Sequence, residues 1–396
     1  MYEQLKERFA ARFGRKADYI FSAPGRTELS GNHTDHQHGC VLAAAVDRET
    51  LAAIAENGTM TVNLLSEGYP LCVVDLTDLA VHPQEAGKTT ALIRGVAAKF
   101  REFGVRGFDA YVTSNVLSGS GLSSSAAFEV LMGVIFNHMT GAGFDAVKIA
   151  QIGQYAENVY FGKPCGLMDQ MASSVGNIIG IDFKDPAAPV VTPMDFDFES
   201  TGYSLCIIDS GASHADLTDE YAAITRELKA VCTVFGKEFL RDVSEDEFYP
   251  RLAQVRAACG DRAVLRAIHV FGENKRVAKQ TRALLEHDFE SFLHYMKESG
   301  SASWRLLQNV IPAGRRENQE VALALALAEK LLDGKGACRV HGGGFAGTIQ
   351  AFVPGDMVDS FTAGMDAVLG QGSCQVMAIR NYGGVLAEDC RGKIEN

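Results

Sequence analysis

Glycine is concentrated in three short stretches of this chain, and these stretches constrain its fold more than any other feature. The 396 residues include 40 glycines, and clusters of them lie at residues 25–39, 119–121 and 342–347. Glycine loses more backbone entropy on folding than other residues, so a cluster marks a tight turn or a place where backbone comes close to another group. The three clusters are therefore the first candidates for functional loops.

The length and composition indicate an ordinary globular protein of two domains. A chain of 396 residues has room for two domains of common size. Its hydrophobic fraction of 47% and charged fraction of 22% are close to globular averages. The longest apolar runs, residues 41–46 and 322–328, fall far short of the ~20 residues that cross a bilayer. The first residues are rich in charge, so we expect no secretory signal.

Charge and cysteine usage exclude several kinds of partner. The chain has 37 basic and 49 acidic residues, a net charge of −12, so its average field repels nucleic acid and anionic membranes. A small anionic ligand is not excluded, because backbone dipoles dominate the field at close range. The nine cysteines are scattered, with no Cys-x-x-Cys pair. We therefore expect reduced thiols in a cytoplasmic protein, with neither a disulfide framework nor a cysteine zinc site.

Hydrophobic periodicity predicts strands and helices in a mixed arrangement. The first half reads as mixed α/β, and the second half is helix-rich with a terminal sheet. A polar, acidic stretch at residues 195–202 is the expected boundary between domains at residues 1–200 and 201–396. Strands are predicted at residues 50–55, 61–65, 71–75, 108–113, 178–182, 204–209, 337–340 and 347–353. Helices are predicted at residues 2–13, 88–103, 124–140, 147–160, 219–234, 261–286, 288–298 and 317–332.

The middle cluster has the layout of a phosphate-binding loop. A predicted strand precedes it, and three serines at positions 123–125 stand at the start of an apolar helix. Helix N-termini carry unpaired N–H donors and a partial positive charge, which suit phosphate oxygens. A capped helix with small packing residues explains the pattern equally well. Two common nucleotide motifs are excluded, because His82 stands where a P-loop needs its first glycine and the residues after Gly121 do not fit the dinucleotide fingerprint.

The first cluster is a polar segment suited to a polyol such as a sugar. Arg26 supplies a permanent planar cation, and His33 and Asp35 supply donors and acceptors within a few residues. A zinc site built from His33, His36 and His38 is the alternative. However, no distal ligand cluster accompanies these histidines, and structural zinc commonly uses cysteine as well. We therefore expect His36 and His38 in a solvated loop.

Two further segments are informative mainly in combination with the others. Asp169 follows a glycine turn and lies among Leu167, Met168 and Met171, where a carboxylate has either a partner or a function. A helix-capping aspartate is the simpler interpretation of that residue. Residues 342–347 lie between two predicted strands, and a tight hairpin explains them when they are taken alone.

Taken together and in order, the segments resemble those of the GHMP kinase superfamily, and specifically the galactokinases. Residues 25–42 are similar to the galactokinase signature, 118–129 to the phosphate loop, 165–170 to the segment with the catalytic aspartate, and 342–347 to the third glycine-rich motif. The resemblance spans residues 21–353. It implies an α+β, mixed α/β fold of two domains, with the active site in the cleft between them. It also implies transfer of the γ-phosphoryl group of ATP to the anomeric hydroxyl of galactose.

The resemblance assigns roles to individual residues of this chain. Asp169 would orient or deprotonate the sugar hydroxyl, and Arg26 would keep Asp169 ionised and offset charge on the transferred group. Ser125 and Glu157 would hold Mg²⁺. The other expected contacts are Gly119, Ser120, Gly121, Leu122, Ser123, Ser124 and Ser125 for the nucleotide, Asn32, His33, Asp35, Gly166 and Tyr221 for the sugar, and Gly343 and Gly344 in the third motif. The expected partners are the sugar and ATP, with no nucleic acid or membrane, and the expected assembly is a monomer or homodimer.

One departure from the family concerns the sugar. The galactokinase signature has glutamate before His33, facing the 6-hydroxyl of the sugar, whereas this chain has Asn32. Loss of the charge would weaken a charge-assisted hydrogen bond by about 1–2 kcal/mol and remove repulsion against a 6-carboxylate. A galacturonate kinase or another aldose 1-kinase is therefore the alternative. A non-catalytic galactose sensor is a more remote alternative, because Arg26, Asp169 and the serine loop are intact.

Overall fold

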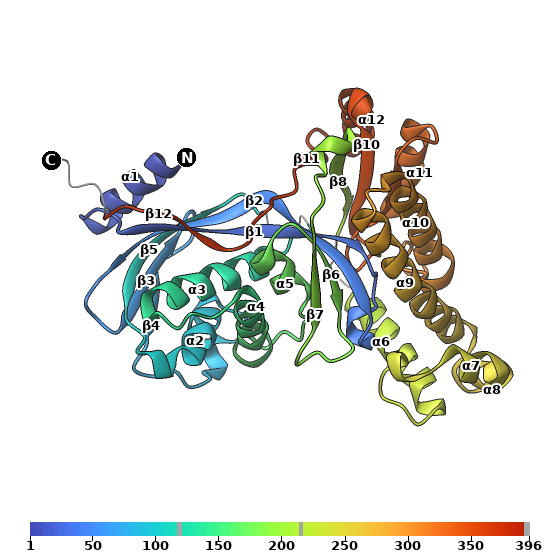
Figure 1. The fold of residues 1–396 in the computed structure, drawn as a ribbon, viewed down its shortest axis with the longest axis horizontal. Helices are drawn as coiled ribbons and strands as arrows, with labels where there is room; N and C mark the ends of the chain where they lie inside the picture. The colour runs from blue at the N-terminus through green and yellow to red at the C-terminus, as the bar shows by residue number, and fades with distance from the viewer. Residues whose placement is uncertain (117–120, 214–216, 392–396) are drawn as a thin grey trace.

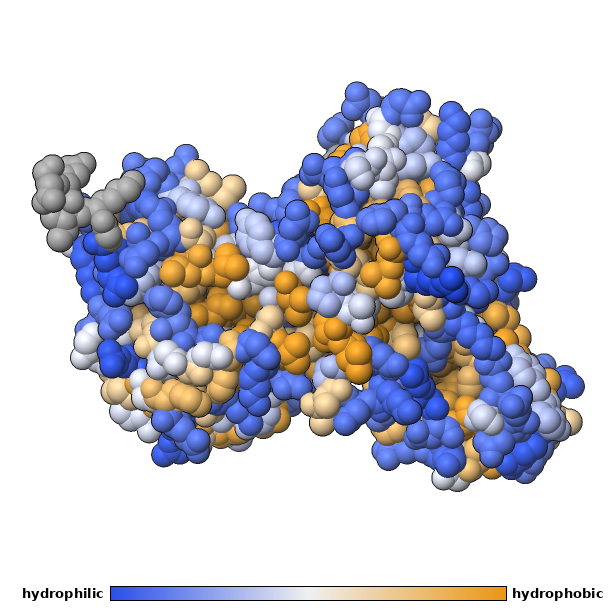
Figure 2. Space-filling model, in the orientation of Figure 1, coloured by the Kyte–Doolittle hydropathy of each residue, from blue (hydrophilic) through white to orange (hydrophobic). Residues whose placement is uncertain are grey.

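The computed structural model of the chain describes residues 1–116, 121–213 and 217–391. These residues form two sheets with helices around them, arranged in two lobes that a pair of long strands connects (Figure 1). Figure 2 shows hydrophilic residues over the outer ends of both lobes and apolar residues gathered toward the middle of the same face. Every helix in the described part of the chain is too short or too polar to span a bilayer.

The sheet of the first lobe is built on the antiparallel pair β1 (Tyr19–Ser30) and β2 (Cys40–Glu56). Its strand order is β12-β1-β2-β5-β3-β4. One part of β2 pairs with β5, and the other part pairs with β6, which in turn pairs with β7. The long β1–β2 pair therefore reaches from the first lobe toward the second. The remaining strands are β3 (Thr61–Ser66), β4 (Cys72–Asp75), β5 (Phe108–Ser114), β6 (Ile178–Asp182), β7 (Val190–Met194) and β12 (Val385–Asp389).

Helices cover both faces of this sheet (Figure 1). On one face α1 (Tyr2–Phe13) buries Leu5 and Phe9, which are spaced four residues apart and so lie on one side of the helix. On the other face a larger apolar core forms between the strands and the remaining helices of the lobe. These helices are α2 (Thr89–Lys99), α3 (Ser124–Thr140), α4 (Ala146–Tyr155) and α5 (Met168–Val175).

The second lobe has a four-stranded sheet in the order β11-β8-β10-β9. One face of this sheet packs against α11 and α12, and the other packs against α10 and the β1–β2 pair of the first lobe. A shared apolar core therefore joins the lobes. The elements are β8 (Tyr203–Ala212), α6 (Thr218–Val234), α7 (Glu245–Phe248), α8 (Leu252–Cys259), α9 (Asp261–Leu285), α10 (Phe289–Ala302), α11 (Glu320–Leu332), β9 (Ala337–Val340), β10 (Gly347–Pro354), α12 (Val358–Leu369) and β11 (Cys374–Met377).

Many predicted elements are confirmed, and the most important miss has a clear cause. The helices predicted at residues 2–13 and 124–140 have these same bounds in the structure. The structure adds β1 at residues 19–30, where we predict no strand. All of β1 is buried, including Arg26 and Glu28, because internal ion pairs satisfy these charges. The structure likewise adds β7, β11, β12 and α12.

The C-terminal strand crosses back from the second lobe to the first. β12 pairs with β1, with Asp389 opposite Tyr19, although it belongs to the segment 201–396 that the sequence assigns to the second domain. The crossing is tight at Gly383, where a Cβ would overlap the carbonyl oxygen of Ser174 in α5. The last strand therefore interlocks the two halves of the sequence.

The substitution Gly383→Ala should destabilise the protein, because the added Cβ meets rigid backbone. We expect a loss of about 1–3 kcal/mol, measured as a lower midpoint of urea or thermal unfolding. Gly272→Ala in α9 is the matched control, because the nearest atoms to its Cβ, at 3.0 Å or more, belong to the end of the Arg276 side chain and not to backbone. Its midpoint should hold or rise. Equal midpoints for the two variants would contradict the close approach at Gly383.

Candidate active site

Arg26 of β1 and Asp169 of α5 make the central contact of the site. Arg26 Nε donates to Asp169 Oδ1 at 2.7 Å, and Nη2 donates to Oδ2 at 2.8 Å, which is a bidentate geometry. Ser123 Oγ donates to the same Oδ2 at 2.7 Å, and Arg26 Nη1 donates to the Gly121 carbonyl oxygen at 2.5 Å. The Asp169 side chain is 31% exposed and that of Arg26 only 10%. The carboxylate is therefore accessible to a ligand, with its counter-ion buried behind it.

These contacts hold Asp169 in its ionised form. Burial alone would raise the pKa of Asp169, but the charge of Arg26 and hydrogen bonds from Arg26 and Ser123 outweigh burial and lower the pKa below its ordinary value of 3.8. The side chain is consequently an acceptor for a hydroxyl proton at neutral pH.

Three serines stand at the start of α3, beside this pair. Ser123 has the left-handed conformation, with φ 57°, and α3 begins at Ser124. Ser123, Ser124 and Ser125 all line a cavity of about 370 Å³ that also includes Arg26 and Asp169. The unpaired N–H groups and positive dipole end of α3 are thus available to an anion in this cavity.

The preceding residues of the loop have different environments. Gly121 has φ 74°, and a Cβ there would lie 2.6 Å from Thr348 Oγ1, so only glycine fits without a shift. Leu122 is buried. Its carbonyl oxygen accepts a hydrogen bond from the backbone N–H of Arg26 at 2.9 Å. Gly119 and Ser120, which we predict as nucleotide contacts, lie outside the described residues.

Glu157 is a buried carboxylate beside the serine loop. Ser125 Oγ donates to Glu157 Oε1 at 3.2 Å, Lys163 Nζ donates to the same oxygen at 3.2 Å, and Gln170 Nε2 donates to Oε2 at 2.9 Å. Oxygens about 3 Å apart can take neighbouring corners of an Mg²⁺ octahedron with bonds of about 2.1 Å. Ser125 and Glu157 therefore fit an Mg²⁺ that draws its other ligands from phosphate and water. Within the described residues, no three His, Cys, Asp or Glu side chains are grouped to hold a metal by themselves.

The third glycine cluster supplies backbone to the same cavity. Gly343 and Gly344 line it, and a Cβ on Gly344 would overlap the carbonyl oxygen of Asn309. A Cβ on Gly343 would lie 2.7 Å from the ring of Tyr221, whose hydroxyl donates to the Gly344 carbonyl oxygen at 2.8 Å. Burial raises the pKa of Tyr221 to about 12. The neutral Tyr221 hydroxyl therefore helps to hold the backbone of the third motif in place.

His33 and Asp35, predicted as sugar contacts, follow β1, and the third such residue, Gly166, lies just before α5 and against Asp35. His33 Nε2 is 2.9 Å from the Gly343 carbonyl oxygen. Gly166 leaves room for Asp35, because a Cβ on Gly166 would overlap the Asp35 carboxylate. Burial raises the pKa of Asp35, and the charge of Asp169 adds to the rise against opposing hydrogen bonds. Asp35 therefore lies within electrostatic reach of Asp169, and both His33 and Asp35 are half-buried.

Asn32 is buried in a polar network in this structure, and its predicted contact with the sugar stays a prediction. No part of Asn32 is exposed. Its Nδ2 donates to Glu28 Oε1 at 3.0 Å and to the Gly342 carbonyl oxygen at 2.6 Å, while its Oδ1 accepts from Asn309 Nδ2 at 2.7 Å. Arg339 donates to the same Glu28 oxygen at 2.7 Å. The side chain turns inward because this polar network satisfies every group it carries.

Three further residues line the cavity and are not among the predicted site residues, namely Lys163, His341 and Thr348. His341 Nδ1 lies 2.8 Å from Thr348 Oγ1, and burial lowers the pKa of His341 to about 3, so this imidazole is neutral. A sequence signal existed for Lys163, which stands midway between Glu157 and Asp169. His341 directly follows β9 and Thr348 lies in β10, so their positions beside the glycine cluster 342–347 were the available signal for these two.

Comparison with known proteins agrees with this geometry. Residues 7–56 match the galactokinase galactose-binding signature, and residues 91–177 match the GHMP kinases N terminal domain. The chain is 30% identical to a galactokinase of Glaesserella parasuis serovar 5 (strain SH0165) over 367 residues, covering 90% of this chain and 91% of that protein. The crystal structure of Lactococcus lactis galactokinase complexed with galactose matches with a TM-score of 0.80 at 25% identity, covering 97% of this chain and 99% of that one. A mevalonate kinase crystal structure shares the fold, with a TM-score of 0.65 at 13% identity and coverage of 91% and 99%.

The buried position of Asn32 leads to a stability prediction. Asn32→Glu would place a second carboxylate against Glu28 Oε1 and the Gly342 carbonyl oxygen. An uncompensated buried charge costs about 3–5 kcal/mol, so the midpoint of urea unfolding should fall sharply. The double variant Glu28→Asn/Asn32→Glu keeps one acid and one amide at this contact and should recover much of the loss. A single variant as stable as the parent would show that residue 32 faces solvent instead.

Proposed function

The chain belongs to the galactokinase family of the GHMP kinases, and we propose that it transfers the γ-phosphoryl group of ATP to the anomeric hydroxyl of galactose. The products are galactose 1-phosphate and ADP. The observation that carries this proposal is the Arg26–Asp169 ion pair, which lines the cavity of about 370 Å³ beside the N-terminus of α3. A fixed carboxylate and a fixed cation are what phosphoryl transfer requires of side chains.

Asp169 receives the sugar hydroxyl in this mechanism. Its lowered pKa keeps it an acceptor, so it orients the anomeric O–H toward the γ-phosphate and takes the proton as the new P–O bond forms. Arg26 fixes the carboxylate through two hydrogen bonds and adds positive charge beside the transferred group. The N–H groups at the start of α3 and the glycine backbone of the third motif bind phosphate oxygens. His33, Asp35 and Gly166 hold the sugar.

We propose that Ser125 and Glu157 hold Mg²⁺ together with the phosphates of ATP. The ion would neutralise phosphate charge as the bond to the leaving group breaks. The spacing of the two oxygens, 3.2 Å, supports this assignment.

Galactose remains the proposed sugar rather than galacturonate. The case for galacturonate depends on an uncharged residue 32 facing the 6-position. Asn32 is buried, and its amide is used to hold Glu28 and Gly342. Its replacement of glutamate therefore adds no room and no cation for a 6-carboxylate.

We also propose a cytoplasmic location and a monomer or homodimer that acts on its two small substrates. All nine cysteines are free thiols, as suits a reducing compartment. The intact Arg26–Asp169 pair favours catalysis over the alternative of a galactose sensor.

The substitution Asp169→Asn should abolish most turnover while leaving ligand binding. The amide keeps the shape of the side chain but cannot accept the proton, so kcat should fall by about 10²–10⁴. Steady-state kinetics measure the loss, and calorimetric titration with ATP and galactose checks binding. Asp195→Asn makes the same substitution at an exposed position outside the cavity and should keep full activity. Near-normal turnover by Asp169→Asn would remove Asp169 from the mechanism.

A sugar panel tests the substrate. With Mg²⁺ and ATP, galactose should give ADP at least tenfold faster than galacturonate, since one missing or repulsive polar contact costs about 1.4 kcal/mol or more. Faster turnover of galacturonate would overturn the choice of sugar. Galactose binding without ADP release across the whole panel would instead support the sensor.

A further inference from the structure

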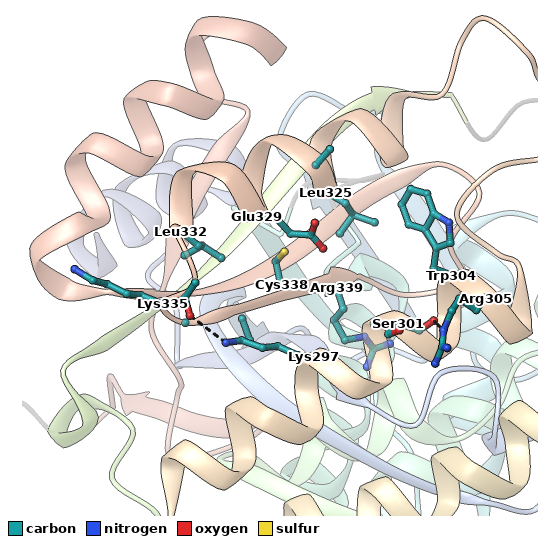
Figure 3. Close-up of a pocket in the computed structure, with 15 residues that line it drawn as sticks. Lys297, Ser301, Trp304, Arg305, Leu325, Glu329, Leu332, Lys335, Cys338 and Arg339 are labelled. Atoms are coloured by element: carbon teal, nitrogen blue, oxygen red, sulfur yellow. Dashed lines mark hydrogen bonds between the residues drawn. The ribbon is translucent and has the colours of Figure 1, made fainter.

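A second cavity, of about 540 Å³, lies in the second lobe and shares no lining residue with the active-site cavity. It is enclosed by α10, the π-helical turn Ser303–Leu307, α11 and β9 (Figure 3). Buried Leu325 and Leu332 and the partly exposed thiol of Cys338 give it an apolar interior. Its volume lies in the range of about 300–1,000 Å³ that is typical of small-molecule sites.

Unpaired positive charge surrounds this apolar interior. Lys297, Arg305 and Lys335 line the cavity and are exposed, and none of them forms an ion pair with a carboxylate of the described residues. Glu329 is the one acidic side chain in the lining. Three cations against one acid make a local excess of positive charge on a chain whose net charge is −12. Such a site selects an anion.

An aromatic surface stands at one end of the cavity. Trp304 is the single tryptophan of the chain and is 42% exposed. Its indole lies on the same side of the cavity as Leu325, while Lys297 and Lys335 lie toward the other end (Figure 3). Exposed indole rings favour stacking with another ring. The cavity thus offers a stacking surface at one end and ammonium groups at the other.

We propose that this cavity binds a small anionic aromatic molecule, a ring system carrying a carboxylate, sulfonate or phosphate group. The ring lies against Trp304 and Leu325, and the anionic group lies at the end of the cavity where Lys297 and Lys335 stand. Binding at this position regulates the affinity for the sugar.

Two contacts connect the cavity with the Asn32 network behind the active site. Arg339 forms part of the cavity lining, and its Nη2 donates to Glu28 Oε1, which also accepts from Asn32. Ser303 precedes Trp304 in the π-helical turn, and its hydroxyl lies 3.5 Å from Asn32 Oδ1. Asn32 in turn holds the carbonyl oxygen of Gly342 in the third motif. A shift of Trp304 or Arg339 on binding is therefore transmitted to the loop beside His33.

Tryptophan fluorescence tests the binding directly. The probe is 8-anilinonaphthalene-1-sulfonate, an anionic aromatic compound, and its neutral counterpart is N-phenyl-1-naphthylamine. The sulfonate should quench Trp304 emission saturably, with one site per chain, and should bind roughly tenfold tighter than the neutral compound. No saturable change at Trp304 would overturn the site, and equal affinities for the two probes would overturn its preference for anions.

Three variants locate the binding. Lys297→Gln/Lys335→Gln should weaken sulfonate binding by roughly tenfold. Lys184→Gln/Lys237→Gln makes the same change in charge at exposed lysines outside the cavity and should bind like the parent. Ala326→Phe, at an exposed lining position, should block binding. Unchanged affinity in the first or third variant, with unchanged thermal midpoints, would overturn the proposal.

A kinetic measurement tests the coupling and rests on the proposed function. Saturating probe should change the KM for galactose in the parent protein, with little change in kcat, and should have no effect in Ala326→Phe. An unchanged KM with the cavity occupied would overturn the regulatory role. The fluorescence measurement needs no activity, so failure of the site and failure of the kinase assignment can be distinguished.

Discussion

The bidentate ion pair between Arg26 and Asp169 is the interaction on which the rest of the site depends. Burial alone would raise the pKa of Asp169, and the charge of Arg26 is the main opposing contribution that keeps the carboxylate ionised. Arg26 also holds the Gly121 carbonyl oxygen, and Ser123 donates to Asp169. One arginine on β1 therefore fixes the position of the acid on α5 and the approach to α3. The guanidinium of Arg26 thus connects β1, α5 and the loop before α3.

A second polar network connects β1 with the third glycine motif. Glu28, Asn32 and Arg339 connect β1 with β9 through hydrogen bonds of 2.7–3.0 Å. Asn309 completes it by binding Asn32 and the Gly343 carbonyl oxygen. Buried polar networks are stable when every member is satisfied and costly when one is not. The third motif is thus held by specific hydrogen bonds, and the two lobes are joined both by this network and by a shared apolar core.

The sequence predicts what is local in this protein and misses what is brought together over long distances. The helix after Ser123 is predicted to its exact residues because its apolar period and its serines are adjacent in the chain. The strand β1 is missed because Arg26 and Glu28 appear too polar for a core until Asp169 and Arg339, which lie 143 and 311 residues away, are in place. The burial of Asn32 could not be predicted for the same reason, since its partners Asn309 and Gly342 come from the other lobe. The approach of His341 to Gly121 could not be predicted, because these residues are 220 positions apart and only the fold brings them together.

The balance of charge in the cavity determines how phosphate binds there. Arg26 is paired with Asp169, and Lys163 with Glu157, so the charged side chains that line or border the cavity are close to neutral in sum. The chain as a whole carries −12 and repels a triphosphate at long range. Attraction must then come from groups that act at short range, which are the N–H donors at the start of α3 and the glycine backbone of residues 342–344. The proposed Mg²⁺, held by Ser125 and Glu157, would add positive charge for the phosphates to this balance.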